Sequence, residues 1–205
     1  STEERSRALK IYNWADYIDE DVLAEFPDWY KQQTGEDLRI IYQVFDINEI
    51  MLTKIERGQE DFDLVCPSEY IIERMLKKDL LLPINRNFGK TPDYIPNISP
   101  YIQKELEKIS QPGRHTNDYI VPYMWGTAGI LYNKKFKTLE EVSSWGCLWD
   151  AVNRGKILMK DSYRDAYGTA IIYAHARQLA DSTITVEQLM NDNSPEAIAL
   201  AEQYL

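Results

Sequence analysis

Cysteine and histidine are scarce in this sequence of 205 residues, with two of each. Cys66 and Cys147 stand far apart without CxxC spacing, so neither a zinc site nor a disulfide framework is supported, and two inert thiols are expected. His115 and His175 flank no evident serine or cysteine nucleophile, and Ser68 is not part of a G-x-S-x-G elbow. Thiol chemistry and a hydrolase triad are therefore poor explanations of the function.

Long apolar runs are also missing. The longest uncharged run, residues 119–133, is shorter than the roughly 18 apolar residues that span a bilayer, and Pro122, Gly126 and Gly129 interrupt it. We therefore expect no membrane-spanning segment. The N-terminal residues are polar and lack the apolar core of a secretory signal, so we expect that a signal segment is absent or was removed before residue 1.

Glycine-rich phosphate loops and an excess of positive charge are absent as well. Gly126 and Gly129 fit neither the dinucleotide nor the Walker pattern, and no cofactor is indicated. The formal net charge is −10, which disfavours nucleic acid as a partner and favours a cationic ligand.

The first half of the chain alternates strand-like and helix-like segments. Strands are predicted at 9–12, 38–45 and 62–66, and helices at 19–33, 47–57 and 69–77. Asp19 or Glu20 is predicted to open the first of these helices, Gly35 to close it and Pro27 to split it. This order predicts a parallel sheet covered on both faces, with ligands bound at the carboxyl ends of its strands.

The second half has weaker patterns. We expect two extended pieces within 120–132, a strand at 156–159 and a long helix over 165–180. A last helix is predicted to begin at Ser194 and Pro195.

Two loops at predicted strand ends carry candidate binding residues. Trp14, Asp16 and Tyr17 follow the first strand and combine two aromatic faces with a carboxylate. A capping aspartate between two semi-buried aromatics is an equal alternative. Ser68 and Tyr70 follow the third strand, where Ser68 or Glu69 is as readily a helix cap. Aromatic faces and carboxylates are the groups that bind amines.

A third candidate lies at the strand-to-helix turn 160–165. Ser162 and Asp165 stand there, and helix capping again competes with ligand binding.

Five motifs, in order and spacing, resemble the periplasmic spermidine/putrescine-binding proteins, the substrate-binding components of ABC polyamine importers. The resemblance extends over residues 9–180. The motifs are Tyr12-Asn13-Trp14-x-x-Tyr17, Phe62-Asp63-Leu64-Val65-x-Pro67-Ser68-x-Tyr70, Val121-Pro122-Tyr123-x-Trp125-Gly126, Ser144-Trp145-x-x-Leu148-Trp149 and the turn from Asp161 to Asp165.

The resemblance implies an α/β fold of the type II periplasmic binding class, with two lobes of mixed sheet flanked by helices that close on a ligand. Residues 1–124 would form the N-terminal part of the first lobe, and 125–205 the hinge crossover and the start of an incomplete second lobe. It further implies a non-enzymatic receptor, periplasmic or lipid-anchored in the cell envelope, that delivers putrescine or spermidine to the membrane subunits of an importer.

The resemblance also assigns roles to residues of the cleft. Trp14 and Tyr17 would stack on the methylene chain, Asp16 would receive an ammonium group, and Ser68 and Tyr70 would hydrogen-bond and wall the ligand. Asp165 matches one of two carboxylates that the family offers at the second-lobe turn. The other position holds Ser162, which should disfavour a highly charged ligand; Glu69 is a possible additional acceptor.

Two alternatives stay open. One is a binding protein for another small cationic or polar solute, and the other is an enzyme on the same fold whose carboxylates act as acid and base. Because the family's chains normally continue well past position 205, we expect a truncated chain that binds polyamine weakly and associates with itself through uncovered apolar faces.

Overall fold

The computed structural model describes residues 2–58 and 60–205. The chain divides into two compact units, Ser1–Gly126 and Thr127–Leu205.

A parallel sheet of three strands forms the centre of the first unit. The strands are β1 (Ala8–Trp14), β2 (Arg39–Phe45) and β3 (Leu64–Val65), in the order β2-β1-β3. The ladder between β1 and β2 runs from Ala8 opposite Arg39 to Trp14 opposite Phe45, and β3 adds a short pairing that ends at Tyr12 opposite Val65. The predicted strands and their parallel arrangement are confirmed.

The α-helices of the first unit alternate with these strands. They are α1 (Thr2–Ser6), α2 (Glu20–Thr34), α3 (Asn48–Glu56), α4 (Glu69–Lys77) and α5 (Pro100–Glu107), with short 3-10 turns at Ile95–Asn97 and Thr116–Asp118. Asp19 caps α2 by accepting a hydrogen bond from the Asp21 backbone at 3.0 Å. Gly35, with φ of +84°, ends it, because a glycine enters the left-handed region without steric cost.

The predicted break at Pro27 is wrong. The structure has one continuous helix from Glu20 to Thr34 with Pro27 inside it. A proline removes a single backbone donor from the helix, and here both helix ends are capped.

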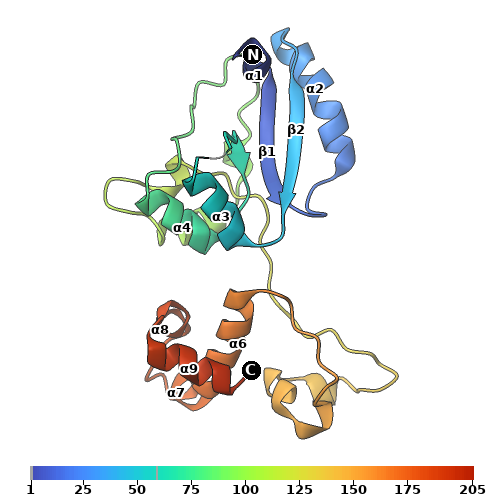
Figure 1. Cartoon of the computed structure of the whole chain (residues 1–205), viewed down its shortest axis with the longest axis vertical. Coiled ribbons are helices and arrows are strands. Elements are labelled where there is room, and N and C mark those ends of the chain that lie inside the picture. The colour runs from blue at the N-terminus through green and yellow to red at the C-terminus, as the bar shows by residue number, and fades with distance from the viewer. Residues whose placement is uncertain (1, 59) are drawn as a thin grey trace. The chain divides into compact units, whose positions relative to one another are not determined.

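The core of the first unit lies between the sheet and helices α3 and α4. Tyr12 and Phe45 point from the strands toward these helices and meet edge to face, with ring centroids 5.0 Å apart. Met51 from α3 and Ile71 and Met75 from α4 are fully buried in this core. Figure 1 shows α3 and α4 beside β1 and α2 beside β2.

An ionic cluster holds the segment that precedes β3 against β1. Arg5 pairs with Asp61 and, at 3.0 Å, with Asp63, while the Lys10 ammonium lies 2.6 Å from the Asp61 carboxylate. The hydrogen bonds from Lys10 and Arg5 hold the pKa of Asp61 well below its usual range. These contacts position the short third strand, and with it the loop that carries Ser68.

The second unit is helical. It contains α6 (Tyr163–Ala174), α7 (Ala176–Ala180), α8 (Val186–Asn191) and α9 (Pro195–Gln203), with 3-10 turns at Glu140–Val142, Trp145–Trp149 and Ala151–Asn153. Its buried cluster consists of Ala170, Ile171, Leu189, Ala197 and Ala201. The helix predicted over 165–180 is interrupted at His175, and the predicted helix start at Ser194 and Pro195 is confirmed.

The tryptophan motif of this unit packs on α6. Trp149 stacks face to face on Tyr173, with ring centroids 3.7 Å apart, and its indole donates to the Tyr204 carbonyl at 2.8 Å. Trp149 therefore builds the unit and is not free to stack on a ligand, whereas Trp145 is exposed.

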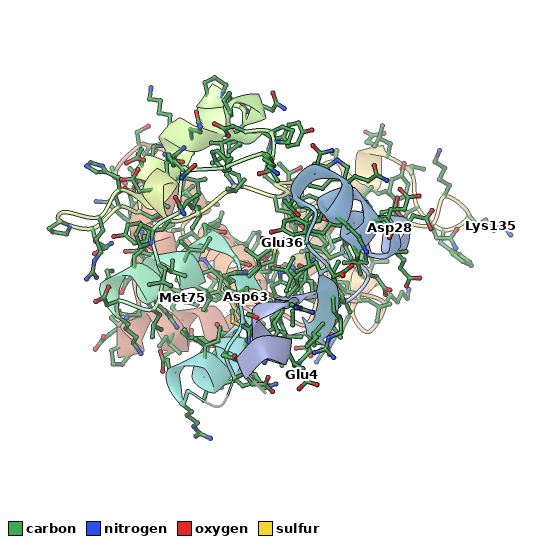
Figure 2. All side chains as sticks on the ribbon, turned by 90° about the horizontal axis from the view of Figure 1, so that it is seen from above. Glu4, Asp28, Glu36, Asp63, Met75 and Lys135 are labelled. Atoms are coloured by element: carbon green, nitrogen blue, oxygen red, sulfur yellow. The ribbon has the colours of Figure 1, made fainter. Side chains whose placement is uncertain are left out.

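The segments of the second half that were predicted to be extended form no strand within the described chain. Residues 120–132 and 156–159 have no regular secondary structure, so the predicted strand at 156–159 is wrong. Leu131 and Leu158 are fully exposed, and Lys135 projects from its loop into solvent (Figure 2). No helix among the described residues is long and apolar enough to cross a bilayer.

Candidate functional site

The candidate residues of the first unit meet at one edge of the sheet. Trp14 ends β1 opposite Phe45, the last residue of β2, and Tyr12 lies opposite Val65, the last residue of β3. Asp16 and Tyr17 therefore follow the central strand, and Ser68 and Tyr70 follow its neighbour. The parallel register brings both predicted loops to the carboxyl edge, where open α/β sheets bind ligands.

Trp14 and Tyr17 are half-buried aromatics with different neighbours. Trp14 packs on Phe45 at a centroid distance of 4.5 Å. Tyr17 meets the Tyr123 ring edge to face at 5.6 Å, and the Tyr123 hydroxyl donates to the Tyr17 carbonyl at 2.7 Å. Partial burial raises the pKa of the Tyr123 hydroxyl above its ordinary value. Tyr123 thus holds the backbone of Tyr17, directly after the turn at residues 15–16.

Asp16 is exposed and adopts a left-handed conformation with φ of +52°. Aspartate tolerates this region better than most residues, yet the conformation is uncommon. The α2 cap is Asp19, so the alternative interpretation of Asp16 as a cap is not supported. Among the described residues Asp16 forms no ion pair, and its carboxylate is therefore accessible to a cationic ligand.

Ser68 and Tyr70 are held by a residue that the sequence analysis did not single out. The amide nitrogen of Asn48 donates to the Ser68 hydroxyl and to the Tyr70 hydroxyl, both at 3.0 Å. The Asn48 amide oxygen accepts from the Ser68 backbone at 3.2 Å, and the Tyr70 hydroxyl donates to Glu49 at 3.0 Å. Ser68 stands at the N-cap of α4, but its side chain makes no capping hydrogen bond.

Glu69 is exposed on the first turn of α4. A carboxylate there is favoured by the positive end of the helix, as it is for Glu49 on the first turn of α3.

In the second unit, Ser162 and Asp165 both have structural partners. The Ser162 hydroxyl caps α6 by accepting from the Asp165 backbone at 3.4 Å. The Asp165 carboxylate is 2.9 Å from the Lys160 ammonium and remains partly exposed. The capping role considered for this turn is therefore present.

Asn48 and Tyr123 are the residues of this edge that sequence reasoning missed. Asn48 lies three residues beyond Phe45, so the strand-end rule applied to β2 would have found it. Tyr123 belongs to the motif that begins at Val121, but nothing in its local pattern places it beside Tyr17, 106 residues earlier.

Other surfaces of the described chain offer little for a ligand or metal. No group of three or more potential metal ligands occurs among the described residues. An open hollow on α3 is lined by Ile50, Thr53, Lys54 and Arg57 together with Glu49. Its two cationic side chains make it unsuited to an amine.

Comparisons with known proteins agree on one family, although no family model matches the chain. The chain is 33% identical over 177 residues to the putrescine-binding periplasmic protein PotF of Escherichia coli, with 82% of this chain and 44% of PotF covered. It is 28% identical over 167 residues to the spermidine/putrescine-binding periplasmic protein of the same species. This alignment covers 81% of this chain and 44% of that protein. SpuD of Pseudomonas aeruginosa, a putrescine-binding periplasmic protein, is 31% identical over 157 residues, with 74% and 39% covered.

Two solved structures share the fold at 30% identity. One is assigned to a spermidine/putrescine ABC transporter of Listeria monocytogenes, with a TM-score of 0.72. The other is the spermidine/putrescine ABC transporter substrate-binding protein PotD of Streptococcus pneumoniae, with a TM-score of 0.63. Each alignment covers 97% of this chain and 53% of the solved chain.

The chain thus spans about half the length of the relatives it matches. The type II periplasmic binding fold expected from the sequence is confirmed by these neighbours. Over the part that it spans, the chain is similar in sequence and in fold to the periplasmic spermidine/putrescine-binding proteins.

Proposed function

We propose that this chain is part of an extracytoplasmic receptor that binds putrescine or spermidine and delivers it to the membrane subunits of an ABC importer. The observation that carries the proposal is the shared sheet edge at which Trp14, Asp16 and Tyr17 lie with Ser68 and Tyr70. The names of the relatives support a polyamine as the ligand and the periplasm as the location.

The chemistry of this edge suits a polyamine. Such a ligand alternates ammonium groups with apolar methylenes, so its site needs acceptors separated by aromatic walls. The Asp16 carboxylate and the hydroxyls of Ser68 and Tyr70 are acceptors, and Trp14 and Tyr17 are aromatic walls. A charge-assisted hydrogen bond contributes about 1.5–3 kcal/mol, and an ammonium over an indole contributes about 2 kcal/mol when desolvated.

We further propose that the two units are parts of the two lobes of the receptor, with 1–124 in the first lobe and 125–205 containing the crossover and the start of the second. Ser162 and Asp165 would then be contributed by the second lobe. The receptor performs no chemistry on its ligand, and its relatives are named as binding proteins.

The test is a titration of the isotope-labelled chain with putrescine, followed by the chemical shifts of backbone amides and indole groups. This readout detects weak binding. We expect shifts at 14–17, 68–70 and the Trp14 indole that saturate with putrescine. Sodium chloride at matched ionic strength and 1,4-butanediol, which has the same methylene chain without charge, serve as controls.

The alternatives predict different results. Shifts no larger than those with sodium chloride would contradict polyamine binding. Conversion of putrescine to a product, measured by mass spectrometry after incubation, would favour an enzyme instead.

A further inference from the structure

Asp16 has a backbone conformation that its residue type does not favour. Its φ of +52° lies in the left-handed region. A residue with a Cβ is strained there, and such a conformation persists only where neighbouring contacts hold it. The conformation matters for the candidate site, because the backbone angles of Asp16 set the direction in which its exposed carboxylate leaves the loop.

The chain before Asp16 is held by the sheet and by Asn13. Trp14 is the last residue of the β1 ladder, opposite Phe45, and its backbone N–H donates to the Asn13 side-chain oxygen at 2.8 Å. Asn13 is only 3% exposed, so this acceptor lies within the packed protein. The loop therefore starts from a fixed point at Trp14.

The chain after Asp16 is held by Tyr123. The Tyr123 hydroxyl donates to the Tyr17 carbonyl at 2.7 Å, and the two rings meet edge to face at 5.6 Å. With Trp14 and the Tyr17 carbonyl both held, a rotation of the Asp16 backbone toward negative φ would disturb one of these contacts. The two anchors thus enclose the strained residue.

The contact between Tyr123 and Tyr17 is not explained by the sheet or by burial of the ring. Tyr123 lies in a segment without regular secondary structure, 106 residues after Tyr17, and its side chain is 50% exposed. The raised pKa of its hydroxyl is what partial removal of that group from water produces. The hydrogen bond is therefore the specific feature of this tyrosine.

We propose that Tyr123 is a positioning residue of the amine site, whose hydroxyl holds the Tyr17 backbone and thereby keeps Asp16 in the conformation from which its carboxylate meets an ammonium group. This inference rests on the proposed function. It extends the site from the loops at the strand ends to the segment 121–126.

The experiment compares two tyrosine-to-phenylalanine variants of the chain. Tyr123→Phe removes the hydroxyl and keeps the ring. Its control is Tyr167→Phe, because the Tyr167 hydroxyl also donates to the carbonyl of a distant residue, Asp192 at 2.5 Å, in the other unit. One measurement is the titration with putrescine. The other is the nuclear Overhauser effect between the amide and α protons of Asp16, which is strong only when φ is positive.

We expect Tyr123→Phe to weaken putrescine binding by about 3- to 10-fold, the loss that corresponds to one hydrogen bond. It should also weaken the Overhauser effect within Asp16. Tyr167→Phe should leave binding within about twofold and this Overhauser effect unchanged.

A second comparison distinguishes positioning from a direct contact between Tyr123 and the ligand. Asp16→Gly removes the carboxylate and adopts the left-handed conformation without strain. If Tyr123 acts through Asp16, adding Tyr123→Phe to Asp16→Gly should weaken binding by less than about twofold further. A further loss of about 3- to 10-fold would overturn the positioning role.

The readouts separate this inference from the proposed function. Parent-like binding by Tyr123→Phe would overturn the positioning role while leaving polyamine binding intact. If the parent itself binds no putrescine, the proposed function fails, and the Overhauser effect within Asp16 then decides whether Tyr123 holds the loop: an unchanged signal in Tyr123→Phe overturns it, and a weakened one supports it.

Amide hydrogen exchange in β1 and β2 guards against a variant that does not fold. Protection of these strands in Tyr123→Phe should match the parent, because neither Tyr123 nor Tyr17 belongs to the buried core. A general loss of protection would contradict a role confined to the loop.

Discussion

The two units of this chain differ in whether the segments predicted to be extended pair into a sheet. In the first unit, β1 pairs along its whole length with β2 and, at Ile11 and Tyr12 in its middle, with β3. The strand side chains Tyr12 and Phe45 are buried under α3 and α4. In the second unit, residues 127–132 and 156–159, which the sequence predicted to be extended, belong to no strand of the described chain, and Leu131 and Leu158 are fully exposed.

The difference shows that a strand is a property of two segments. An extended apolar segment becomes part of a sheet only when another segment satisfies its backbone groups. The second unit is stabilised by helices packed through small residues, with Ala170, Ala197 and Ala201 around Ile171. Helix formation needs no distant partner, because its hydrogen bonds are local.

The largest expected effect comes from the two cores. Ile71 and Ile171 are both fully buried, one in each unit. Replacing either by alanine should lower the free energy of unfolding of its own unit by about 2–5 kcal/mol, because the lost methyl groups leave a cavity. Amide hydrogen exchange in β1 and β2 measures the effect of the Ile71 substitution. Exchange in α6 and α9 measures the effect of the Ile171 substitution. Unchanged protection in the affected unit would contradict its core assignment, and valine at each position, expected to cost about 0.5–1.5 kcal/mol, is the control.

The next largest expected effect is on putrescine binding, and it differs between the two candidate aspartates. Asp16→Asn should weaken putrescine binding by about 1.5–3 kcal/mol, since an accessible carboxylate opposite an ammonium is lost while asparagine still tolerates the left-handed backbone. Asp165→Asn should have a smaller effect, because Lys160 already neutralises that carboxylate. Titration of both variants decides. A larger loss with Asp165→Asn would place the main cation contact in the second unit.

A smaller effect on stability is expected at Ser162, where two substitutions distinguish a capping role from a ligand-binding role. Ser162→Ala should lower the stability of the second unit by about 0.5–2 kcal/mol, as should Ser194→Ala at the start of α9. Ser162→Asp keeps a capping oxygen and adds a charge, so stability should persist while the preference moves toward spermidine. Thermal unfolding and competition between the two amines measure these outcomes. An unstable aspartate variant would argue against the capping role.

The smallest effect concerns the exposed leucines. Leu131→Ser and Leu158→Ser should change stability by less than about 0.5 kcal/mol, because neither side chain is buried. Self-association stays a prediction, and these variants test it: light scattering should show less association than in the parent if uncovered apolar segments cause it. Association that is unaffected by both substitutions would exclude these two side chains as its cause.

Local signals explain what sequence reasoning predicted well. The boundaries of α2 follow from a capping aspartate and a closing glycine, and the strands of the first unit follow from short apolar runs between them. The edge at which Trp14 and Ser68 lie follows from parallel topology alone. Their roles in binding stay predictions.

What was missed depends on contacts between distant segments. Asn48 matters because Ser68, 20 residues later, lies against it, and Tyr123 reaches Tyr17 across more than 100 residues. The unpaired state of residues 156–159 is likewise decided by the rest of the chain.

The left-handed backbone at Asp16 has a consequence for engineering this protein. Glycine and asparagine adopt that conformation with less strain than aspartate, and neither has a charge. Selection of variants for thermal stability alone would therefore favour loss of the aspartate, and with it the carboxylate offered to the ligand. Stability and ligand affinity are thus opposed at this residue, and a stabilised version of the protein should be designed with Asp16 held constant.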